Sequence, residues 1–417
     1  MSLDAIAGQL ASKSVRQLAS SGLPDAPTVD DAEDNLHPRY DLTVALTYYA
    51  PYVSGLTESA RRVAEGMATR GWRVAVATTQ HDPAQPRRET IGGVDVYRSP
   101  VAGRISRTPL APGLPWLVRR LARQSGVLHL HLPMVDGALI ARLAAAVPIV
   151  SMLHIDLHLP PGPLTRLATA ASDRACRAVI RRSTVMVANS VDQAEGSRFW
   201  PLIRKRRFEP IASPCLQRSN GSAAFRHGTG LHIGFMGRIV EDKGIEYLVR
   251  AFQQIDDPQA RLLIAGNHMT VAGGSNVDRI RAMIGGDHRV EILGELHGQQ
   301  IDDFYASIDV FALPSVAESF GIVQAEAMMA GVPSVTTDIP GGRYPVRATE
   351  FGRVVAPRDP EALVKAIREL ADTPAAWRAE RARIATELFN AEVAVNAHEE
   401  IFRSLLSYDP TRRPRTD

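Results

Sequence analysis

The chain has 417 residues, of which 45% are hydrophobic and 22% are charged, as in ordinary globular proteins. Because this length exceeds what one hydrophobic core usually serves, we expect two domains. The two cysteines, Cys176 and Cys215, stand in no CxxC or Cys/His spacing, which excludes a disulfide framework and indicates thiols in a reducing cytoplasm. The sequence shows neither a signal-peptide pattern nor a run of about 18 uncharged apolar residues that could span a bilayer.

The net charge of +3 hides an uneven distribution along the chain. Residues 1–37 hold 2 Lys/Arg and 6 Asp/Glu, a balance of −4, and residues 216–417 hold 22 and 27, a balance of −5. Residues 38–215 hold 24 Lys/Arg and 12 Asp/Glu, a balance of +12. We therefore expect negatively charged partners to approach this middle block. Nucleic acid is not expected, because the basic clusters lack interleaved aromatic residues and a known binding module.

The first part of the chain predicts an arm followed by a first domain. Residues 1–37 lack a sustained apolar period and contain the acidic run DDAEDN, which predicts a poorly ordered arm. Residues 38–215 alternate helical patterns with short β-rich runs: LTVAL at 42–46, WRVAVA at 72–77, VDVYR at 94–98, VLHLHL at 127–132, PIVSML at 148–153 and TVMVA at 184–188. This alternation predicts a parallel sheet covered by helices on both faces.

The same alternation restarts after a polar linker predicted for residues 216–230. Residues 231–392 contain the runs HIGFMG at 232–237, RLLIAG at 261–266, VEILG at 290–294, VFALP at 310–314, PSVTT at 333–337 and GRVVAP at 352–357. Residues 393–417 are predicted to form a helix and tail that cross back to the first domain. The predicted fold class is α/β, with two doubly wound, Rossmann-like domains that face each other across a ligand cleft.

The segment ESFGIVQAE, at 318–326, places two carboxylates, Glu318 and Glu326, eight positions apart. In a single helix this spacing puts both on nearly one face, about 12 Å apart. Residues 319–322 would form the first helical turn, whose free amides and dipole suit phosphate. The two carboxylates could then accept hydrogen bonds from a sugar and a ribose, although the spacing alone equally allows a solvated glutamate pair.

A second segment, GFMGRIVEDKG at 234–244, ends a predicted strand and places Arg238 and Lys243 before an amphipathic helix. A guanidinium fork combined with an ammonium group suits a diphosphate, and two ordinary surface cations are the alternative. The segment is not a P-loop, because GxxxxGK[ST] is absent.

Two further features lie in the first domain. Gly55 stands between a strand and a helix, where a glycine lets the backbone approach a ligand, and a plain β–α turn is the alternative. The strand ends HLHLP at 129–133 and HIDLH at 154–158 make His131 and His154 candidates for positioning a substrate in the cleft. At strand period, His154, Asp156 and His158 would share one face, as a metal site requires. Because the backbone at a strand end is irregular, we expect one histidine that positions a substrate instead of a metal.

Three of these motifs together resemble a known family. In their order along the chain, GRIVEDKG, ESFGIVQAE and GVPSV are similar to the Arg–Lys and Glu-x7-Glu signatures of glycosyltransferase family 4, the retaining group 1 glycosyltransferases with the GT-B fold. The resemblance covers about residues 40–410. Ser54-Gly55 departs from the glycine pair of many relatives, and residues 1–37 have no counterpart.

The resemblance implies catalytic roles for four residues. Arg238 and Lys243 would neutralise the donor diphosphate, Glu318 would contact the transferred sugar, and His154 would line the sugar pocket.

It also implies a donor-binding set. Glu326 would contact the ribose, Gly55 would close on the diphosphate from the opposite domain, and the segment from Gly294 to Leu296 would hold the base. The backbone at the start of the Glu-x7-Glu helix would contact phosphate or sugar through Ser319, Phe320, Gly321 and Ile322. Candidates for the cleft or the acceptor are His131, Asp156 and Arg343.

The predicted function is transfer of a hexose-like unit from a UDP- or GDP-type sugar to an acceptor hydroxyl, with retention at the anomeric carbon and without cofactor or metal. Asp156 is the one nearby carboxylate for a covalent intermediate, and we expect front-face attack instead. The acceptor is a small molecule, a lipid-linked compound or a glycan, such as a cell-envelope precursor. The alternatives are a GT-B-like sugar-nucleotide epimerase and a non-catalytic nucleotide-sugar-binding protein.

The predicted location is the cytoplasm, with a further hypothesis of contact at the inner face of an anionic membrane. Its basis is three basic clusters in the first domain: VRRLAR at 118–123, RACRAVIRR at 174–182 and IRKRRF at 203–208. Basic, partly apolar helices bind such surfaces, and a solvated arginine-rich surface is the alternative.

Overall fold

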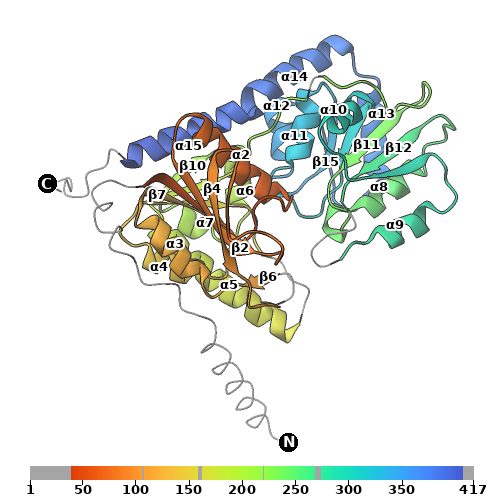
Figure 1. Ribbon diagram of the computed structural model, residues 1–417. Coiled ribbons are helices and arrows are strands. Elements are labelled where there is room, and N and C mark those ends of the chain that lie inside the picture. Colours follow the sequence, from red (N-terminus) through yellow and green to blue (C-terminus); the bar gives the residue numbers. More distant parts are fainter. Residues whose placement is uncertain (1–38, 106–107, 158–161, 219, 268–273, 407–417) are drawn as a thin grey trace, which may run out of the picture. The chain divides into compact units, whose positions relative to one another are not determined.

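The computed structural model describes residues 39–406 apart from 106–107, 158–161, 219 and 268–273. The arm predicted for residues 1–37 and the tail after Leu406 lie outside the described residues. The compact unit Tyr40–Asp417 contains two separate β-sheets, each with its own helices (Figure 1).

The N-terminal sheet has eight strands in the order β10-β9-β8-β7-β1-β2-β4-β3. Its strands are β1 Tyr40–Ala45, β2 Val74–Gln80, β3 Arg88–Ile91, β4 Val94–Pro100, β7 Ser125–Leu132, β8 Ile149–Leu153, β9 Val185–Ala188 and β10 Arg207–Pro210. A small hairpin, β5 Gly103–Ile105 and β6 Thr108–Leu110, stands apart from it. The helices are α2 Gly55–Thr69, α3 Leu114–Ala122, α4 Gly137–Leu143, α5 Pro163–Arg182, α6 Val191–Glu195 and α7 Trp200–Ile203.

The C-terminal sheet has six parallel strands in the order β13-β12-β11-β14-β15-β16. They are β11 His232–Met236, β12 Arg261–Ala265, β13 Val290–Gly294, β14 Val310–Leu313, β15 Ser334–Thr337 and β16 Gly352–Val355. The helical elements are η3 Glu241–Lys243, α8 Ile245–Phe252, α9 Val277–Ile284, α10 Gln299–Ala306, α11 Ile322–Met329, α12 Tyr344–Thr349, α13 Pro360–Ala371, α14 Ala375–Phe389 and α15 Ala391–Leu406.

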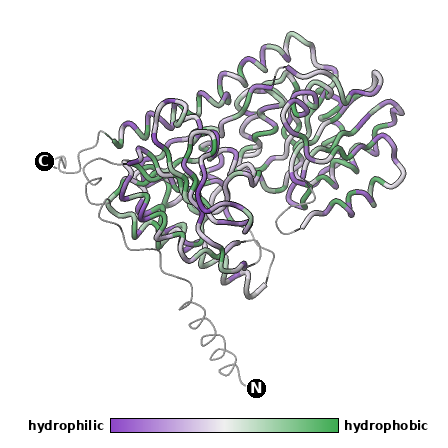
Figure 2. Tube along the Cα trace, viewed as in Figure 1, coloured by the Kyte–Doolittle hydropathy of each residue, from purple (hydrophilic) through white to green (hydrophobic). Residues whose placement is uncertain are grey.

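Hydrophobic residues gather in the strands and on the inner sides of the helices (Figure 2). Each strand predicted from an apolar run is present, and side chains on alternate positions face opposite sides of the N-terminal sheet. In β7, for example, Val127 belongs to the core on one face, whereas Leu128 and Leu130 belong to the core on the other.

The structure adds one departure from the predicted parallel sheet. Strand β3 pairs antiparallel with β4, and the two strands are joined by Gly92 and Gly93, both with positive φ. Two glycines in that conformation allow the tight turn that joins twisted antiparallel strands. The N-terminal sheet is therefore mixed at this edge.

The last helix, α15, packs on α2 and β7 of the N-terminal sheet. Val395 and Phe402 belong to the same core as Val63 of α2. Gly66 explains how close the two helices approach, because a Cβ at this position would lie 2.8 Å from Val395 Cγ2. A larger residue at position 66 would force the helices apart.

Four histidines form a buried cluster where α15 meets the sheet. His129 and His131 lie on the face of β7 that α15 covers, since residues two apart point to the same side. The ring centroids of His129 and His398 are 5.5 Å apart, and His131 Nδ1 lies 2.8 Å from His154 Nε2.

Burial lowers the pKa of every histidine in this cluster, because the low-dielectric interior disfavours the charged imidazolium. The pKa of His154 falls to about 3 and that of His398 to about 4, while those of His129 and His131 lie well below the ordinary value. Neighbouring imidazoles add to the effect at three of the four, the exception being His398. The cluster is therefore neutral in the folded protein.

This cluster predicts loss of stability on mild acidification. An unfolded histidine titrates near pH 6.5, so between that value and the lower folded pKa the unfolded chain binds more protons than the folded one. Stability is then complete above about pH 6.5 and falls by up to about 1.4 kcal/mol per pH unit for each such histidine. Urea unfolding between pH 8 and pH 5 measures this slope.

The variant His398→Gln removes one titrating group and should flatten the slope, even if it lowers stability at every pH. Replacement of the exposed His297, which lies outside the cluster, by Gln serves as the control substitution. A His398→Gln protein with the same pH dependence as the wild type would contradict this account.

Candidate functional site

Each sheet reverses its strand order once, and predicted site segments lie at these reversals. In the C-terminal sheet, β12 and β13 extend from β11 in one direction, and β15 and β16 extend from β14 in the other. Arg238 and Lys243 follow β11, and Glu318 follows β14. Because ligands of doubly wound sheets bind outside the carboxyl ends of the strands at such a reversal, both segments converge on the expected position.

Lys243 and Glu318 form a mostly buried ion pair at this point. Lys243 Nζ lies 2.7 Å from Glu318 Oε2, and each side chain is 14% exposed. Burial alone would raise the pKa of Glu318, but Lys243 and the backbone amides of Ser319 and Phe320 bring it below its ordinary value. Ser319 N donates to Glu318 Oε1 at 3.0 Å. In this arrangement an ionised carboxylate of the protein itself satisfies both the ammonium group and the amides of the loop.

Arg238 gives this site a second cation. It is half-buried at the turn after β11, and its guanidinium forms no hydrogen bond or ion pair within the part of the chain that the structure describes. Arg238 and Lys243 are thus two cations of the turn that follows β11, and Glu241 and Asp242 lie between them in sequence. A guanidinium and an ammonium group are side chains that can bind phosphate groups.

The helix of the Glu-x7-Glu segment begins later than the sequence suggested. Helix α11 starts at Ile322, and Gly321 precedes it in the left-handed conformation with φ of 85°. The expectation of a first turn at residues 319–322 was therefore wrong, because Gly321 breaks the helical path. Glu318 lies in the loop and Glu326 in the helix, so the two carboxylates do not share one helix face.

The segment at the start of α11 still offers backbone groups to a ligand. The side chain of Phe320 is buried against Phe389 and Tyr344, so this residue can meet a ligand only through its backbone. Ile322, the first residue of α11, is half-buried. A helix start after a left-handed glycine presents free amides to an anion.

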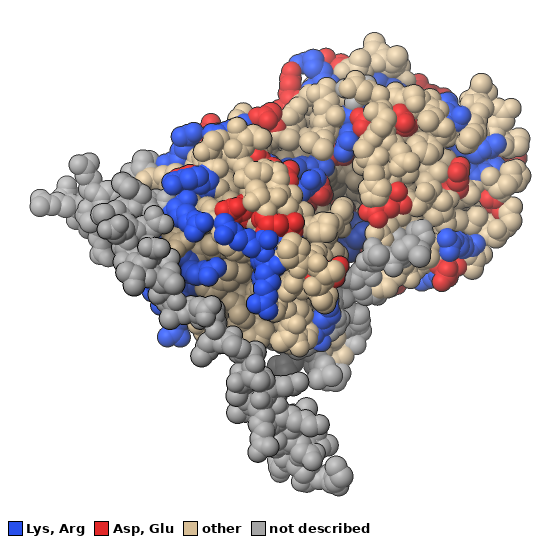
Figure 3. Space-filling model, in the orientation of Figure 1, with Lys and Arg blue, Asp and Glu red and all other residues tan. Residues whose placement is uncertain are grey.

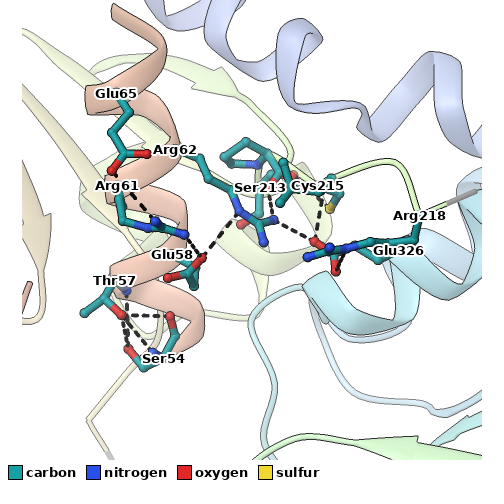
Figure 4. A network of polar contacts seen from close by, with 12 residues as sticks. Ser54, Thr57, Glu58, Arg61, Arg62, Glu65, Ser213, Cys215, Arg218 and Glu326 are labelled. Carbon is teal, nitrogen blue, oxygen red and sulfur yellow. Dashed lines mark hydrogen bonds and ion pairs between the residues drawn. The ribbon is translucent and has the colours of Figure 1, made fainter. Parts of the chain in front are cut away.

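Glu326 points toward the N-terminal half of the chain (Figure 4). Its Oε1 accepts from Arg62 Nη1 at 2.7 Å and from Leu216 N at 3.1 Å. Its Oε2 lies 3.6 Å from Arg218 Nε. The side chain is only 4% exposed.

Arg343, predicted to lie in the cleft, forms a second ion pair that links residues of the two sheets' domains. Its Nη2 lies 2.6 Å from Asp192 Oδ1 of α6, and Gly341 N donates to Asp192 Oδ2 at 2.8 Å. Arg343 also contacts Asp338 at 3.0 Å. The guanidinium of Arg343 is therefore already paired with the carboxylates of Asp192 and Asp338.

On the N-terminal side, Gly55 begins α2 at the end of the loop after β1. Ser54 caps this helix, with Thr57 N donating to Ser54 Oγ at 3.3 Å and Ser54 N donating to Thr57 Oγ1 at 2.8 Å. Gly55 is exposed, and no atom lies within 4 Å of the position of a Cβ. Packing therefore does not demand a glycine here, and the open space leaves room for a ligand.

The histidine and aspartate candidates of this domain point into the protein. His154 is 4% exposed and its ring stacks on His131. Asp156 accepts from Ser197 Oγ at 2.7 Å and from Arg198 N at 2.9 Å, so its carboxylate orders the neighbouring loop. The role of His154 in a sugar pocket stays a prediction.

The segment predicted to hold the base follows β13. Gly294 has a φ of 76° and its carbonyl accepts from Gly266 N at 2.6 Å. Leu296 packs partly on the core of the C-terminal sheet. Between them, Glu295 accepts from Asn267 Nδ2 at 2.7 Å, which joins this segment to the end of β12.

Three charged residues around this site were not among the sequence candidates: Arg62, Asp192 and Arg218. Arg62 lies 264 positions from Glu326, and Asp192 lies 151 positions from Arg343. No local spacing in the sequence signals such pairs.

No group of three or more His, Cys, Asp or Glu side chains among the described residues is arranged to hold a metal ion, and metal independence stays a prediction. None of the helices in the described ranges has the length and apolar character needed to cross a membrane.

Each half of the chain matches a model of a known protein family. Residues 54–213 match the model for the glycosyl transferase 4-like domain, and residues 230–373 match the model for glycosyl transferases group 1. The chain belongs to the group 1 glycosyltransferases. The resemblance seen in the three sequence motifs is thereby confirmed.

Relatives of this glycosyltransferase cover most of its length. An uncharacterised glycosyltransferase of Methanocaldococcus jannaschii is 29% identical over 352 residues, which are 77% of this chain and 86% of the relative. A phosphatidyl-myo-inositol mannosyltransferase of Mycobacterium leprae is 27% identical over 335 residues, which are 75% of this chain and 82% of the relative.

Solved structures confirm the predicted GT-B fold. A sucrose-phosphate synthase from Thermosynechococcus elongatus superposes with a TM-score of 0.68 at 21% identity, covering 88% of this chain and all of the other. An Anabaena protein in complex with UDP-glucose superposes with a TM-score of 0.67 at 18% identity, again covering 88% of this chain and all of the other. At these identities the likeness concerns the fold.

Proposed function

We propose that this glycosyltransferase transfers a hexose-like unit from a nucleoside diphosphate sugar of the UDP or GDP type to an acceptor hydroxyl, with retention at the anomeric carbon. The observation that carries the proposal is the site at the reversal of the C-terminal sheet, where Lys243 pairs with Glu318 and where Arg238, in the same turn as Lys243, has no partner among the described residues. The Anabaena neighbour solved with UDP-glucose supports the class of donor.

In this proposal the protein's internal ion pair exchanges for contacts with the donor. Lys243 and Arg238 take the diphosphate, whose negative charge grows as the glycosidic bond breaks. The amides at the start of α11 add fixed dipoles, and one such donor typically contributes about 3 kcal/mol to transition-state stabilisation. Glu318, released from Lys243, accepts a hydrogen bond from a hydroxyl of the transferred sugar.

The proposed reaction uses front-face attack of the acceptor and needs no cofactor or metal. A covalent intermediate would require a carboxylate nucleophile, and Asp156 is engaged by Ser197 and Arg198. In the proposal the leaving diphosphate is stabilised by side chains and amides in place of a metal ion. If no metal ion takes part, turnover should be unchanged when EDTA is added.

The acceptor is proposed to be a lipid-linked compound or a precursor of a cell-envelope glycan. Support comes from the names of two relatives. One is the mannosyltransferase of phosphatidyl-myo-inositol. The other is the D-inositol 3-phosphate glycosyltransferase of Streptomyces coelicolor, which is 28% identical over 49% of each chain.

Donor binding and turnover provide the test of this function. At 100 times its dissociation constant, a bound nucleotide stabilises a protein by about 2.7 kcal/mol, so UDP or GDP should raise the melting temperature of the wild type and not that of Lys243→Ala. Glu318→Gln should still bind the nucleotide but lose most of its turnover. The anomeric configuration of the product, read by NMR, should match that of the donor.

Other outcomes separate the alternatives. An epimerised sugar nucleotide formed without acceptor would identify an epimerase. Donor binding without turnover on any acceptor would identify a nucleotide-sugar-binding protein. Inversion at the anomeric carbon would contradict the proposed mechanism.

We further propose that the N-terminal domain contacts an anionic membrane, which would supply a lipid-linked acceptor. Trp116 of α3 and Leu139 of α4 are exposed by 55% and 39%, and α4 packs against both α3 and α5. Helix α5 presents exposed arginines at helical spacing: Arg174, Arg177 and Arg181. Lys and Arg side chains gather over this half of the molecule in Figure 3. Apolar tips beside arginines suit the interface of an anionic bilayer.

Sedimentation with phosphatidylglycerol vesicles at low salt tests this contact. The wild type should sediment with the vesicles, and Trp116→Ala should sediment less. Leu388→Ala, which removes another exposed apolar side chain on α14, should behave as the wild type. Failure of the wild type to bind would contradict the proposal.

A further inference from the structure

An ion pair joins the helix that begins at Gly55 to the helix that follows the donor loop. Arg62 of α2 and Glu326 of α11 meet at 2.7 Å, with side chains only 10% and 4% exposed. The contact links the domain of the N-terminal sheet to that of the C-terminal sheet (Figure 4). Removing one partner of such a buried pair leaves an uncompensated charge in a poorly solvated place.

The guanidinium of Arg62 is held from several sides. Arg62 Nη1 donates to Pro214 O at 2.8 Å as well as to Glu326, and Arg62 Nε lies 3.6 Å from Glu58 Oε2. These contacts come from α2 itself, from the chain segment between the two sheets, and from α11. The arginine is therefore placed before any ligand arrives.

The contacts of Glu326 divide unequally between its two oxygens. Oε1 accepts two hydrogen bonds, from Arg62 and from Leu216 N. Within the described ranges, Oε2 contacts Arg218 Nε at 3.6 Å, a distance that is too long for a hydrogen bond. That nitrogen has no hydrogen-bond partner among the same residues. A carboxylate can accept about four hydrogen bonds. In Glu326, the two bonds to Oε1 fix the orientation of the carboxylate, and Oε2 can still accept hydrogen bonds from a ligand.

We propose that Arg62 is a positioning residue of the donor site, contributed by the opposite domain. It holds Oε1 of Glu326 and so leaves Oε2 as the acceptor for a ribose hydroxyl of the nucleotide. Arg62 and Gly55 lie on the same helix, α2. The contact of α2 with the C-terminal domain therefore positions both Glu326, which would bind the ribose, and Gly55, which would contact the diphosphate. This inference rests on the proposed function, and it ties nucleotide affinity to the contact between the two domains.

The test compares two neighbouring arginines of α2. Arg61 pairs with Glu58 and Glu65 within the same helix and serves as the matched control for Arg62. In titration calorimetry with UDP and GDP, Arg62→Gln should weaken binding of the preferred nucleotide about tenfold, whereas Arg61→Gln should stay within about twofold of the wild type. Arg62→Lys restores a cation and should recover part of the affinity.

Variants of the partner show whether the effect passes through Glu326. The double variant Arg62→Gln/Glu326→Gln should bind no more weakly than Glu326→Gln alone, since Arg62 acts only through that carboxylate. Additive losses would overturn the inference. Equal or tighter binding by Arg62→Gln than by the wild type would also overturn it, because the arginine would then play no part or would block the site.

A measurement without nucleotide separates this inference from the proposed function. Arg62→Gln should speed hydrogen exchange at the Leu216 amide, which bonds to the carboxylate that Arg62 holds, and Arg61→Gln should not. If the wild type binds neither nucleotide, the proposed function fails, while faster exchange at Leu216 still shows that Arg62 positions Glu326. Unchanged exchange at Leu216 would overturn the positioning role itself.

Discussion

All the strands that carry site segments run parallel to their neighbours, so their carboxyl ends lie on one edge of each sheet. The rest of the site depends on this constraint. It brings Lys243, which follows β11, to Glu318, which follows β14, across 75 positions of sequence. At the same edge of the other sheet, the loop after β1 leads to Gly55. The chemistry of the site is then set by charged side chains: the Lys243–Glu318 pair lies where the strand order reverses, and the turn that carries Lys243 also carries Arg238.

Ion pairs also connect the two domains. Arg62 with Glu326 and Arg343 with Asp192 each join a residue near one sheet to a residue near the other. Helix α15 adds an apolar connection, because it leaves the C-terminal domain and packs on α2 beside the histidine cluster. Domain contact and donor site thus share helix α2, which carries both Gly55 and Arg62.

Much of this arrangement could be predicted from local sequence. Apolar runs of five or six residues marked six of the eight strands of the N-terminal sheet and all six of the C-terminal sheet. The motifs around Arg238, Lys243 and Glu318 identified the family and the converging loops. Local pattern failed where the backbone departs from regular geometry, as at Gly321, whose left-handed conformation delays the start of α11. It also missed strands β3 and β10, although the Gly92-Gly93 turn was a usable hairpin signal for β3. Contacts such as Arg62–Glu326 could not be predicted, because the two residues lie 264 positions apart and the local sequence around each gives no sign of the other.

The central claim is that loops from both sheets form one donor site. Hydrogen exchange with and without the sugar nucleotide that the enzyme prefers tests it most directly, because protection reports contact at single backbone amides. The account predicts slower exchange in two places at once: at residues 319–324 and 238–244 of the C-terminal domain, and at the start of α2 near Gly55. Protection confined to one domain, or absent from the start of α11, would contradict the shared site.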